Sequence, residues 1–154
     1  MTAENVEECR TMTYTWIHMR EEKWNEEMNQ EISVLHEAFD HMQELGLVGG
    51  VLRRDGQIVA FSIGERLNSE TFVVHFEKAY PDLQGAYPMI NQQFVLHECE
   101  GYAYVNREED TGDPGLRKAK LSYYPDILLP KYELEESRVV YACLLYTSDA
   151  ADDM

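Results

Sequence analysis

Two side chains that could move a proton lie close together in the apolar segment 71–78. His75 and Glu77 are two residues apart, and in a strand this spacing places both on one face. Their imidazole and carboxylate could accept a proton from an attacking amine or hydroxyl. Lys78 would point to the opposite face and could meet a carboxylate there. The other residues predicted on that opposite face are Phe72, Val74 and Phe76. The structural alternative is that His75 and Glu77 form a cross-strand pair or are simply satisfied polar groups.

A basic cluster follows the apolar segment 102–106 and comprises Arg107, Arg117, Lys118 and Lys120. Arg117 and Lys120 are three residues apart in a predicted helix, so they share a helical face. Arginine can clamp a phosphate or carboxylate through two hydrogen bonds, which would make the cluster an anion pocket. Alternatively, Glu108 or Asp110 pairs with these bases and holds the loop onto the helix. The residue pattern leaves both interpretations open.

Two further candidates for catalysis flank this cluster. Asn106 ends the apolar segment before it, and Tyr123 follows the basic helix. The Tyr123 phenol could donate a proton to a leaving group, or its ring could pack on Pro125. Together with His75 and Glu77, these residues are the predicted catalytic set.

A helix start could bind an anion at Gln84, Gly85, Ala86 and Tyr87. The first amides of a helix lack partners, and the positive end of the helix dipole suits a phosphate or a developing oxyanion. Gly85 would permit close approach of the backbone. The alternative is an ordinary helix start, because glycine is common at such turns.

Nucleophilic and metal-dependent chemistry are not predicted. Ser62 and Ser122 lack a histidine and aspartate arrangement, and Cys99 has no neighbouring base. His97 and Cys99 are two residues apart, but they have no second ligand pair, so no metal site is expected. The residue types favour direct transfer in a ternary complex, which needs positioning and oxyanion stabilisation.

Composition narrows the class of protein. The chain has 154 residues, of which 44% are hydrophobic, so one domain with a real core is expected. Its net charge of −16 disfavours broad nucleic-acid binding. There is no apolar run long enough to span a membrane and no signal peptide, so a cytoplasmic location is expected. Three cysteines without a CxxC spacing indicate reduced thiols.

The elements that would position these residues follow from hydrophobic periodicity. Helices are predicted from Thr2 to about Glu22 and over a second stripe that Gly46 ends. Asp55-Gly56 is a hairpin signal between two strands. The full predicted order is two helices, strands over 48–54, 57–65 and 71–78, a helix over 84–99, a strand over 102–106, a helix over 115–123 and a last strand over 127–132. No GxGxxG or Walker motif is present.

Several segments resemble the phosphatidylglycerol lysyltransferase C-terminal domain family, over roughly Glu31 to Tyr132. The most specific part is the NRE…GLRKAK…SY…P block. The segments that carry the resemblance are Tyr104 to Gly112, Gly115 to Pro125, Ala60 to Glu65, His75 to Ala79, Gly85 to Tyr87 and Asn91 to Phe94.

The resemblance implies an acetyltransferase-like (GNAT) fold: an α+β or α/β architecture with a mixed, mostly antiparallel sheet flanked by helices. It implies transfer of an acyl or aminoacyl group to an amine or hydroxyl, with aminoacyl-tRNA or acyl-CoA as donor. In this fold two neighbouring strands part, and the helix starting at Gln84 would point into the gap, with the acceptor side after Asn106. The acyl-CoA fingerprint of the fold is not matched, because Asp82 stands where Gln or Arg is expected and Tyr87 where Gly or Ala is expected.

The soluble relatives in this family carry two such domains in tandem, which implies that an N-terminal GNAT-like domain and, for an aminoacyl donor, tRNA are partners. The expected single domain is 1–140. Residues 141–154 resemble translated sequencing-adapter sequence, and we expect a non-native or disordered tail without function. A non-catalytic anion- or peptide-binding module and an inactive fragment are the alternative interpretations of the chain.

Overall fold

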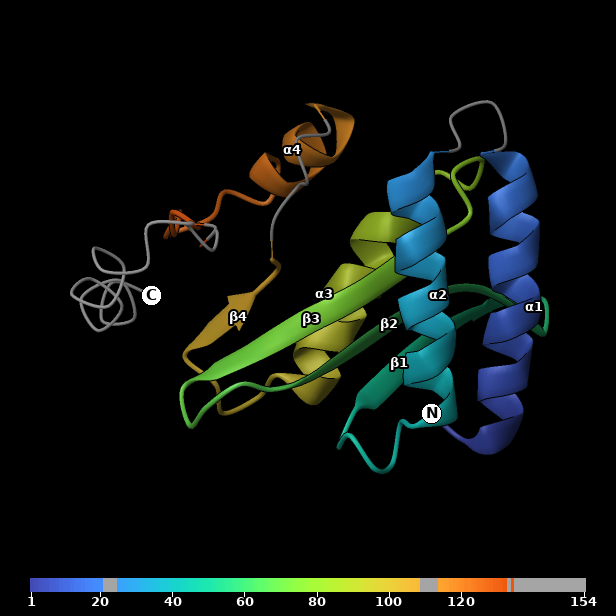
Figure 1. Cartoon of the computed structure of the whole chain (residues 1–154), viewed down its shortest axis with the longest axis horizontal. Coiled ribbons are helices and arrows are strands. Elements are labelled where there is room, and N and C mark those ends of the chain that lie inside the picture. The colour runs from blue at the N-terminus through green and yellow to red at the C-terminus, as the bar shows by residue number, and fades with distance from the viewer. Residues whose placement is uncertain (21–24, 109–113, 133, 135–154) are drawn as a thin grey trace, which may run out of the picture. The chain divides into compact units, whose positions relative to one another are not determined.

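The structure is a computed structural model that describes residues 1–20, 25–108, 114–132 and 134. It contains two compact units, Met1–Glu109 and Asp110–Met154, and each is described by itself. The first unit holds the sheet and three helices (Figure 1). The predicted tail 141–154 lies outside the described residues, as does Glu22.

Two capped helices open the first unit. α1 spans Ala3–Met19, and the predicted cap is confirmed: the Thr2 side chain accepts a hydrogen bond from the Asn5 amide at 3.3 Å, and the Asn5 side-chain oxygen accepts one from the Thr2 amide at 3.1 Å. α2 spans Glu26–Asp40 and starts at the cap residue Asn25. It ends at Asp40, whereas the sequence predicted that it would continue to Gly46. From His41 onward the chain forms turns.

The sheet has the order β1-β2-β3-β4. Its strands are β1 (Val48–Arg54), β2 (Gln57–Arg66), β3 (Thr71–Ala79) and β4 (Tyr104–Asn106). The first three strands pair antiparallel, whereas β4 lies parallel to β3. The predicted Asp55-Gly56 turn is confirmed, with φ values of 52° and 80° as a type I′ hairpin requires.

A β-bulge changes which residues of β3 share a face. Ile63 pairs with Phe76 and Gly64 pairs with Val74, so His75 is the extra residue. Phe76 therefore packs against the cluster from α1 and α2, whereas Phe72 and Val74 pack against α3. The prediction that Phe72, Val74, Phe76 and Lys78 share one face was wrong, because simple alternation does not anticipate an inserted residue.

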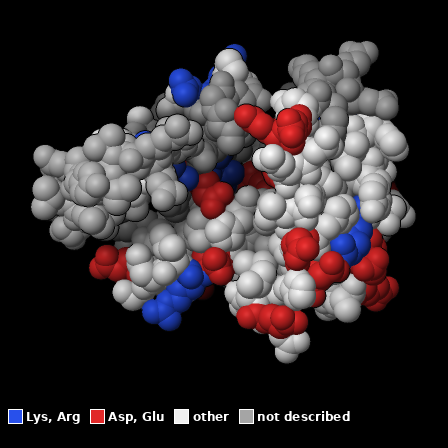
Figure 2. Space-filling model, in the orientation of Figure 1, with Lys and Arg blue, Asp and Glu red and all other residues white. Residues whose placement is uncertain are grey.

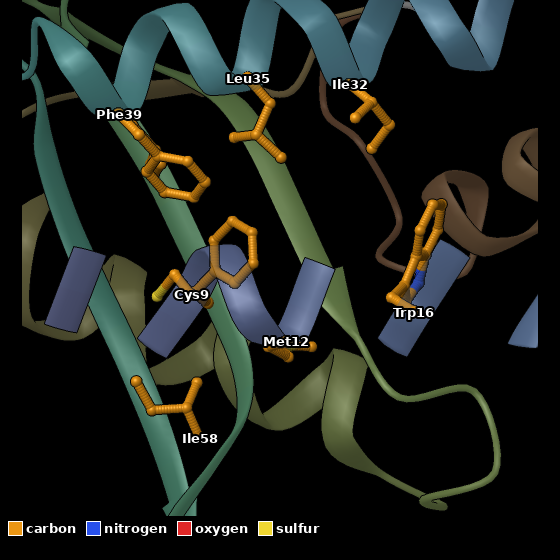
Figure 3. Close-up of a cluster of buried hydrophobic side chains, with 9 residues drawn as sticks. Cys9, Met12, Trp16, Ile32, Leu35, Phe39 and Ile58 are labelled. Atoms are coloured by element: carbon orange, nitrogen blue, oxygen red, sulfur yellow. The ribbon is translucent and has the colours of Figure 1, made fainter. Parts of the chain in front are cut away.

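The sheet lies between helical layers. α1 and α2 cover one face, and α3 (Ala86–Glu98) covers the other (Figure 1). Figure 3 shows the main core, where side chains of α1 and α2 meet above Ile58 of β2. Leu35 and Phe61 are almost fully buried there, and each such side chain contributes roughly 1.5–3 kcal/mol. The helix pair therefore holds β2 and β3 in place from one side.

The second unit contains α4 (Pro114–Leu121), which begins one residue earlier and ends two residues earlier than the predicted helix over 115–123, with proline at its first position. The strand predicted over 127–132 is not formed. Leu128 and Leu129 are each 74% exposed, and the described residues of this unit include no strand with which their backbone could pair. The apolar run alone was therefore a misleading signal.

The chain's acidity is visible on its surface. Figure 2 shows Asp and Glu side chains spread over the side formed by α1 and α2, with few Lys and Arg among them. None of the described helices has the length and apolar character needed to cross a membrane.

Candidate functional site

β3 and β4 are joined at their beginning only. Their pairs are Thr71 with Tyr104, Phe72 with Val105, and Val73 with Asn106. β3 continues to Ala79, so among the described residues its second half has no strand partner on the β4 side. The chain departs from the sheet after Asn106. The pairing of these two strands therefore ends at Val73, as expected where neighbouring strands of this fold part.

α3 begins just beyond the end of β3. Gly85 precedes the helix with φ 83°, a conformation that favours glycine, and a side-chain atom added there would meet open space. The helix offers few free amides, because Ala86 donates to the Leu83 carbonyl at 3.2 Å and Pro88 has no N–H. Tyr87 carries the amide of this first turn that no backbone carbonyl accepts among the described residues. One amide suits a single carbonyl oxygen or oxyanion better than a pyrophosphate.

Glu77 lies at the centre of a hydrogen-bonded group on the α3 side of the sheet. The Ser62 hydroxyl donates to one carboxylate oxygen at 3.0 Å, and Arg107 Nη2 donates to the other at 2.8 Å. Arg107 also donates to the side-chain oxygen of Asn91 in α3. The Glu77 side chain is only 11% exposed. Glu77 therefore ties β2, β3, α3 and the segment after β4 together, and its first role is to position Arg107.

His75, the bulged residue, makes a second connection to the same segment. Its Nδ1 lies 2.7 Å from Glu108 Oε1, and its Nε2 lies 3.0 Å from Glu65 Oε1. Burial alone would lower the pKa of His75, but the hydrogen bonds and charges of the two carboxylates outweigh it, and the pKa is raised. A protonated imidazole donates to both carboxylates, so His75 acts as a bridge between β2 and the chain after β4.

A third group surrounds the first turn of α3. Trp16 Nε1 donates to the Tyr87 hydroxyl at 3.3 Å. Burial raises the pKa of the Tyr87 phenol, so it stays protonated at neutral pH. Lys78, on the opposite face of β3 from Glu77, meets the predicted carboxylate: its Nζ lies 2.5 Å from Glu31 Oε1.

Predicted site residues are thus brought together in part. His75, Glu77, Arg107 and Glu108 converge beside β3, and Gly85, Ala86 and Tyr87 form the helix start next to it. Gln84 is exposed in the preceding turn, and Asn106 accepts the Glu108 amide at 2.8 Å, which shapes the loop.

The remaining predicted residues lie outside the described residues or in the second unit. Asp110 lies outside the described residues. Arg117, Lys118 and Lys120 lie on α4, and Tyr123 follows α4, all in the second unit. The pairing of Glu108 or Asp110 with Arg117 or Lys120 stays a prediction, and Glu108 itself contacts His75.

Three members of the group were missed as site residues: Ser62, Glu65 and Asn91. Ser62 was considered only as a nucleophile, although the 57–79 hairpin register places it opposite Glu77. Counting back from the Asn68 turn in regular register would place Ser62 opposite Phe76 instead, because the bulge at His75 shifts the register by one residue. Asn91 and Glu65 carry no comparable local signal, because Asn91 comes from another element and Glu65 reaches His75 through the bulge.

The two cysteines that the structure describes are poor nucleophiles. Cys9 and Cys99 are buried free thiols, and burial raises their pKa values to about 12 and about 11. Among the described residues there is no cluster of three His, Cys, Asp or Glu side chains arranged to hold a metal ion.

Comparison with known proteins places this geometry in context. A family model described as "Phosphatidylglycerol lysyltransferase, C-terminal" matches residues 1–135. A crystal structure of a conserved protein of unknown function from Bacteroides thetaiotaomicron VPI-5482 is 43% identical, with a TM-score of 0.79, over 83% of this chain and 43% of that one. The chain thus spans less than half the length of that relative. No curated protein matches the chain.

A more distant structure shares the fold. Ribosomal-protein-alanine N-acetyltransferase from Brucella melitensis biovar Abortus 2308 is 13% identical, with a TM-score of 0.58 over 88% of this chain and 96% of that one. The predicted GNAT-like arrangement of a mixed sheet flanked by helices is confirmed by this similarity.

Proposed function

Because the chain belongs to the phosphatidylglycerol lysyltransferase C-terminal family, we propose that it transfers an acyl or aminoacyl group to an amine or hydroxyl acceptor at the opening between β3 and β4. The observation that carries this proposal is the short β3–β4 pairing, which ends at Val73 while β3 runs on to Ala79 beside the start of α3. That unpaired length of β3 gives an extended donor a backbone edge to lie against.

The reaction is a direct displacement. The acceptor nitrogen or oxygen bonds to the donor's carbonyl carbon, and the ester bond of an aminoacyl-tRNA or the thioester bond of an acyl-CoA breaks. The acceptor's proton goes to the departing oxygen or sulfur, which leaves as a hydroxyl or a thiol. Charge builds on the carbonyl oxygen during this step, and a fixed amide beside it lowers the barrier. The Tyr87 amide and the backbone of the bulge at His75 are the groups available for that role.

The donor is expected to be an aminoacyl ester in preference to a coenzyme A thioester. Asp82 precedes the helix, and the first turn offers one free amide, so a pyrophosphate would find repulsion and few donors. The net negative charge of the chain also disfavours binding of tRNA. An N-terminal domain that binds the nucleic acid would remove this difficulty. Such a domain is proposed as a partner, in line with the length of the Bacteroides relative.

The Glu77–Arg107 pair supplies the test of the proposal. Glu77→Gln keeps the shape but removes the charge that holds Arg107, so the segment after β4 should lose its position. We expect the rate of transfer from charged tRNA to an amine acceptor to fall at least about tenfold, the usual effect of a misplaced positioning group, in a variant that still unfolds in one cooperative transition. Glu70→Gln, in the exposed β2–β3 turn, is the matched control and should leave the rate unchanged.

The same assay separates the alternatives. If the folded chain, supplied with its N-terminal domain, transfers from neither aminoacyl-tRNA nor acyl-CoA but binds small anions, it is a binding module and the transferase proposal fails. If Glu77→Gln transfers as fast as the unchanged chain, transfer does not occur beside this pair.

A further inference from the structure

We propose that Arg20, Trp16 and Tyr87 form a recognition site for an oxyanion, a carboxylate or phosphate group, carried by the acceptor substrate. These residues come from the end of α1 and the first turn of α3, 67 to 71 positions apart in sequence. That the anion belongs to the acceptor rests on the proposed function; the existence of the anion site does not.

The indole of Trp16 is the centre of the site. The Arg20 guanidinium lies 5.1 Å from its ring centroid, and Lys78 Nζ lies 4.5 Å from it. Both distances are within the range of a cation–π interaction. The Trp16 Nε1–H is taken by the Tyr87 hydroxyl at 3.3 Å. The ring is thus fixed by its own hydrogen bond and holds a cation close to the start of α3.

The two cations beside Trp16 differ in whether a described carboxylate pairs with them. Lys78 is neutralised by Glu31, whose Oε1 lies 2.5 Å from Nζ. Glu77, the other nearby carboxylate, is engaged by Ser62 and Arg107. Arg20 has no such partner among the described residues, and its Nε is buried without a hydrogen bond. In a chain of net charge −16, a cation with no carboxylate partner among the described side chains is unusual, and a buried N–H without an acceptor is costly.

A bound oxyanion would supply both a negative charge and a hydrogen-bond acceptor for Arg20. It would accept the Arg20 N–H groups, which present a planar fork suited to carboxylate or phosphate. It would also lie near the Tyr87 hydroxyl, because the Arg20 charge acts on that phenol. A neutral or cationic ligand would leave Arg20 uncompensated. The chemistry of the site therefore selects an anion.

The position of the site relative to β3 suggests how the substrate lies. Trp16 and Lys78 belong to the face covered by α1 and α2, whereas Glu77 and Arg107 belong to the α3 face. Lys78 and Glu77 are neighbours in β3 and point to opposite sides. An acceptor anchored by its anionic group at Arg20 would reach the end of β3 from the side opposite the Glu77–Arg107 pair.

Trp16 provides a direct optical test. The chain has two tryptophans, Trp16 and Trp24, so Trp24→Phe leaves Trp16 as the sole indole reporter. In that background, the fluorescence should change saturably on titration with sodium acetate or inorganic phosphate at constant ionic strength. Saturation by acetate alone indicates a carboxylate site, and saturation by phosphate indicates a phosphate site. A linear response to both anions overturns the proposal.

Variants of Arg20 make the test specific. Arg20→Gln should weaken the binding at least about tenfold, the usual effect of losing a charge-assisted hydrogen bond, and Arg20→Lys should weaken it less. Arg54→Gln, an exposed arginine at the end of β1, should bind as before. Equal binding by Arg20→Gln and its parent overturns the proposal, and Arg20→Lys keeps the test valid if the glutamine variant unfolds.

The two proposals fail separately. If the chain binds the anion through Arg20 but transfers no acyl group, the anion site stands and the proposed transferase function fails. If the Arg20→Gln variant transfers an acyl group as fast as its parent at a limiting concentration of acceptor, the proposed function stands. The proposal that Arg20 binds the acceptor then fails.

Discussion

His75 shows how one inserted residue can acquire a structural task. The bulge places its ring between Glu65 and Glu108, at 3.0 Å and 2.7 Å. This arrangement joins the sheet to the chain that leaves β4. A histidine held between two carboxylates is a bridge when protonated and a weaker contact when neutral, because a neutral imidazole has a single N–H.

The bridge predicts a dependence of stability on pH. The pKa of His75 is raised in the folded protein, so its contribution is full below the unfolded value of about 6.5 and is lost as the pH rises through the raised folded value. His75→Asn should therefore lower the free energy of unfolding by about 1–2 kcal/mol near pH 5.5, and by less near pH 9. Urea unfolding at both pH values measures this difference.

His41 offers the matched control for this prediction. It also faces two carboxylates, Glu37 and Glu44, but its side chain is 47% exposed. Exposed ion pairs contribute little, so His41→Asn should change the stability by less than about 0.5 kcal/mol at either pH. A loss for His75→Asn that grows with increasing pH would contradict the bridge.

At the scale of elements, the β2–β3 hairpin sets the geometry of the site. Its register places Ser62 opposite Glu77, and its bulge moves His75 out of the regular alternation. Gly64 lies at the bulge, where β3 comes close: an added Cβ would be 2.3 Å from the Val73 carbonyl oxygen and 2.7 Å from the Phe72 ring. Glycine is required there by contact with backbone, not by an unusual φ.

Gly64→Ala should accordingly be strongly destabilising. The carbonyl of Val73 belongs to a paired strand and cannot move aside cheaply, so we expect a loss of about 2 kcal/mol or more in the free energy of unfolding. Urea denaturation measures it. Gly49→Ala in β1 is the control, because its nearest neighbour is the flexible side chain of Met1, and it should cost less than about 1 kcal/mol. Equal costs for the two variants would show that the bulge is not closely packed.

At the scale of the whole molecule, the chain covers 43% of a relative that it matches at 43% identity. That proportion is compatible with the tandem arrangement that the sequence resemblance implied. A tRNA that carries the donor needs a basic surface to bind, and the carboxylates on the side of α1 and α2 (Figure 2) repel its phosphates. A second domain could supply that basic surface.

The net charge of −16 predicts that salt stabilises the fold. Repulsion among 29 acidic residues, opposed by only 13 basic ones, is greater in the compact state and is screened by added ions. Raising KCl from about 0.02 M to about 0.3 M, which shortens the Debye length severalfold, should raise the thermal midpoint by about 2–5 °C.

Two comparisons decide how that result is interpreted. NaCl should act like KCl, because screening does not depend on the cation. A rise with sulfate alone would indicate anion binding instead of screening, and a midpoint that falls with KCl would mean that surface ion pairs such as Arg53–Glu8 outweigh the general repulsion.

The sequence by itself determined what depends on neighbouring residues. The Thr2 cap, the Asp55-Gly56 turn and the strands on either side of it follow from backbone preferences and from periodicity over a few residues. The family and its fold class were also predicted from sequence, mainly from the motif between Tyr104 and Pro125, and a family model matches residues 1–135. The same local logic failed at 127–132, where an apolar run did not become a strand.

Tertiary structure alone decided the contacts that make the site. Arg107 reaches Glu77 across 30 positions, Glu108 reaches His75 across 33, and Trp16 reaches Tyr87 across 71. Such pairs depend on how the parallel strand β4 returns to β3 and on where a single bulge falls, and neither leaves a periodic trace in the sequence. The residue types were therefore predictable, but their partners were not, because side chains from four elements meet only once the sheet has closed between its helices.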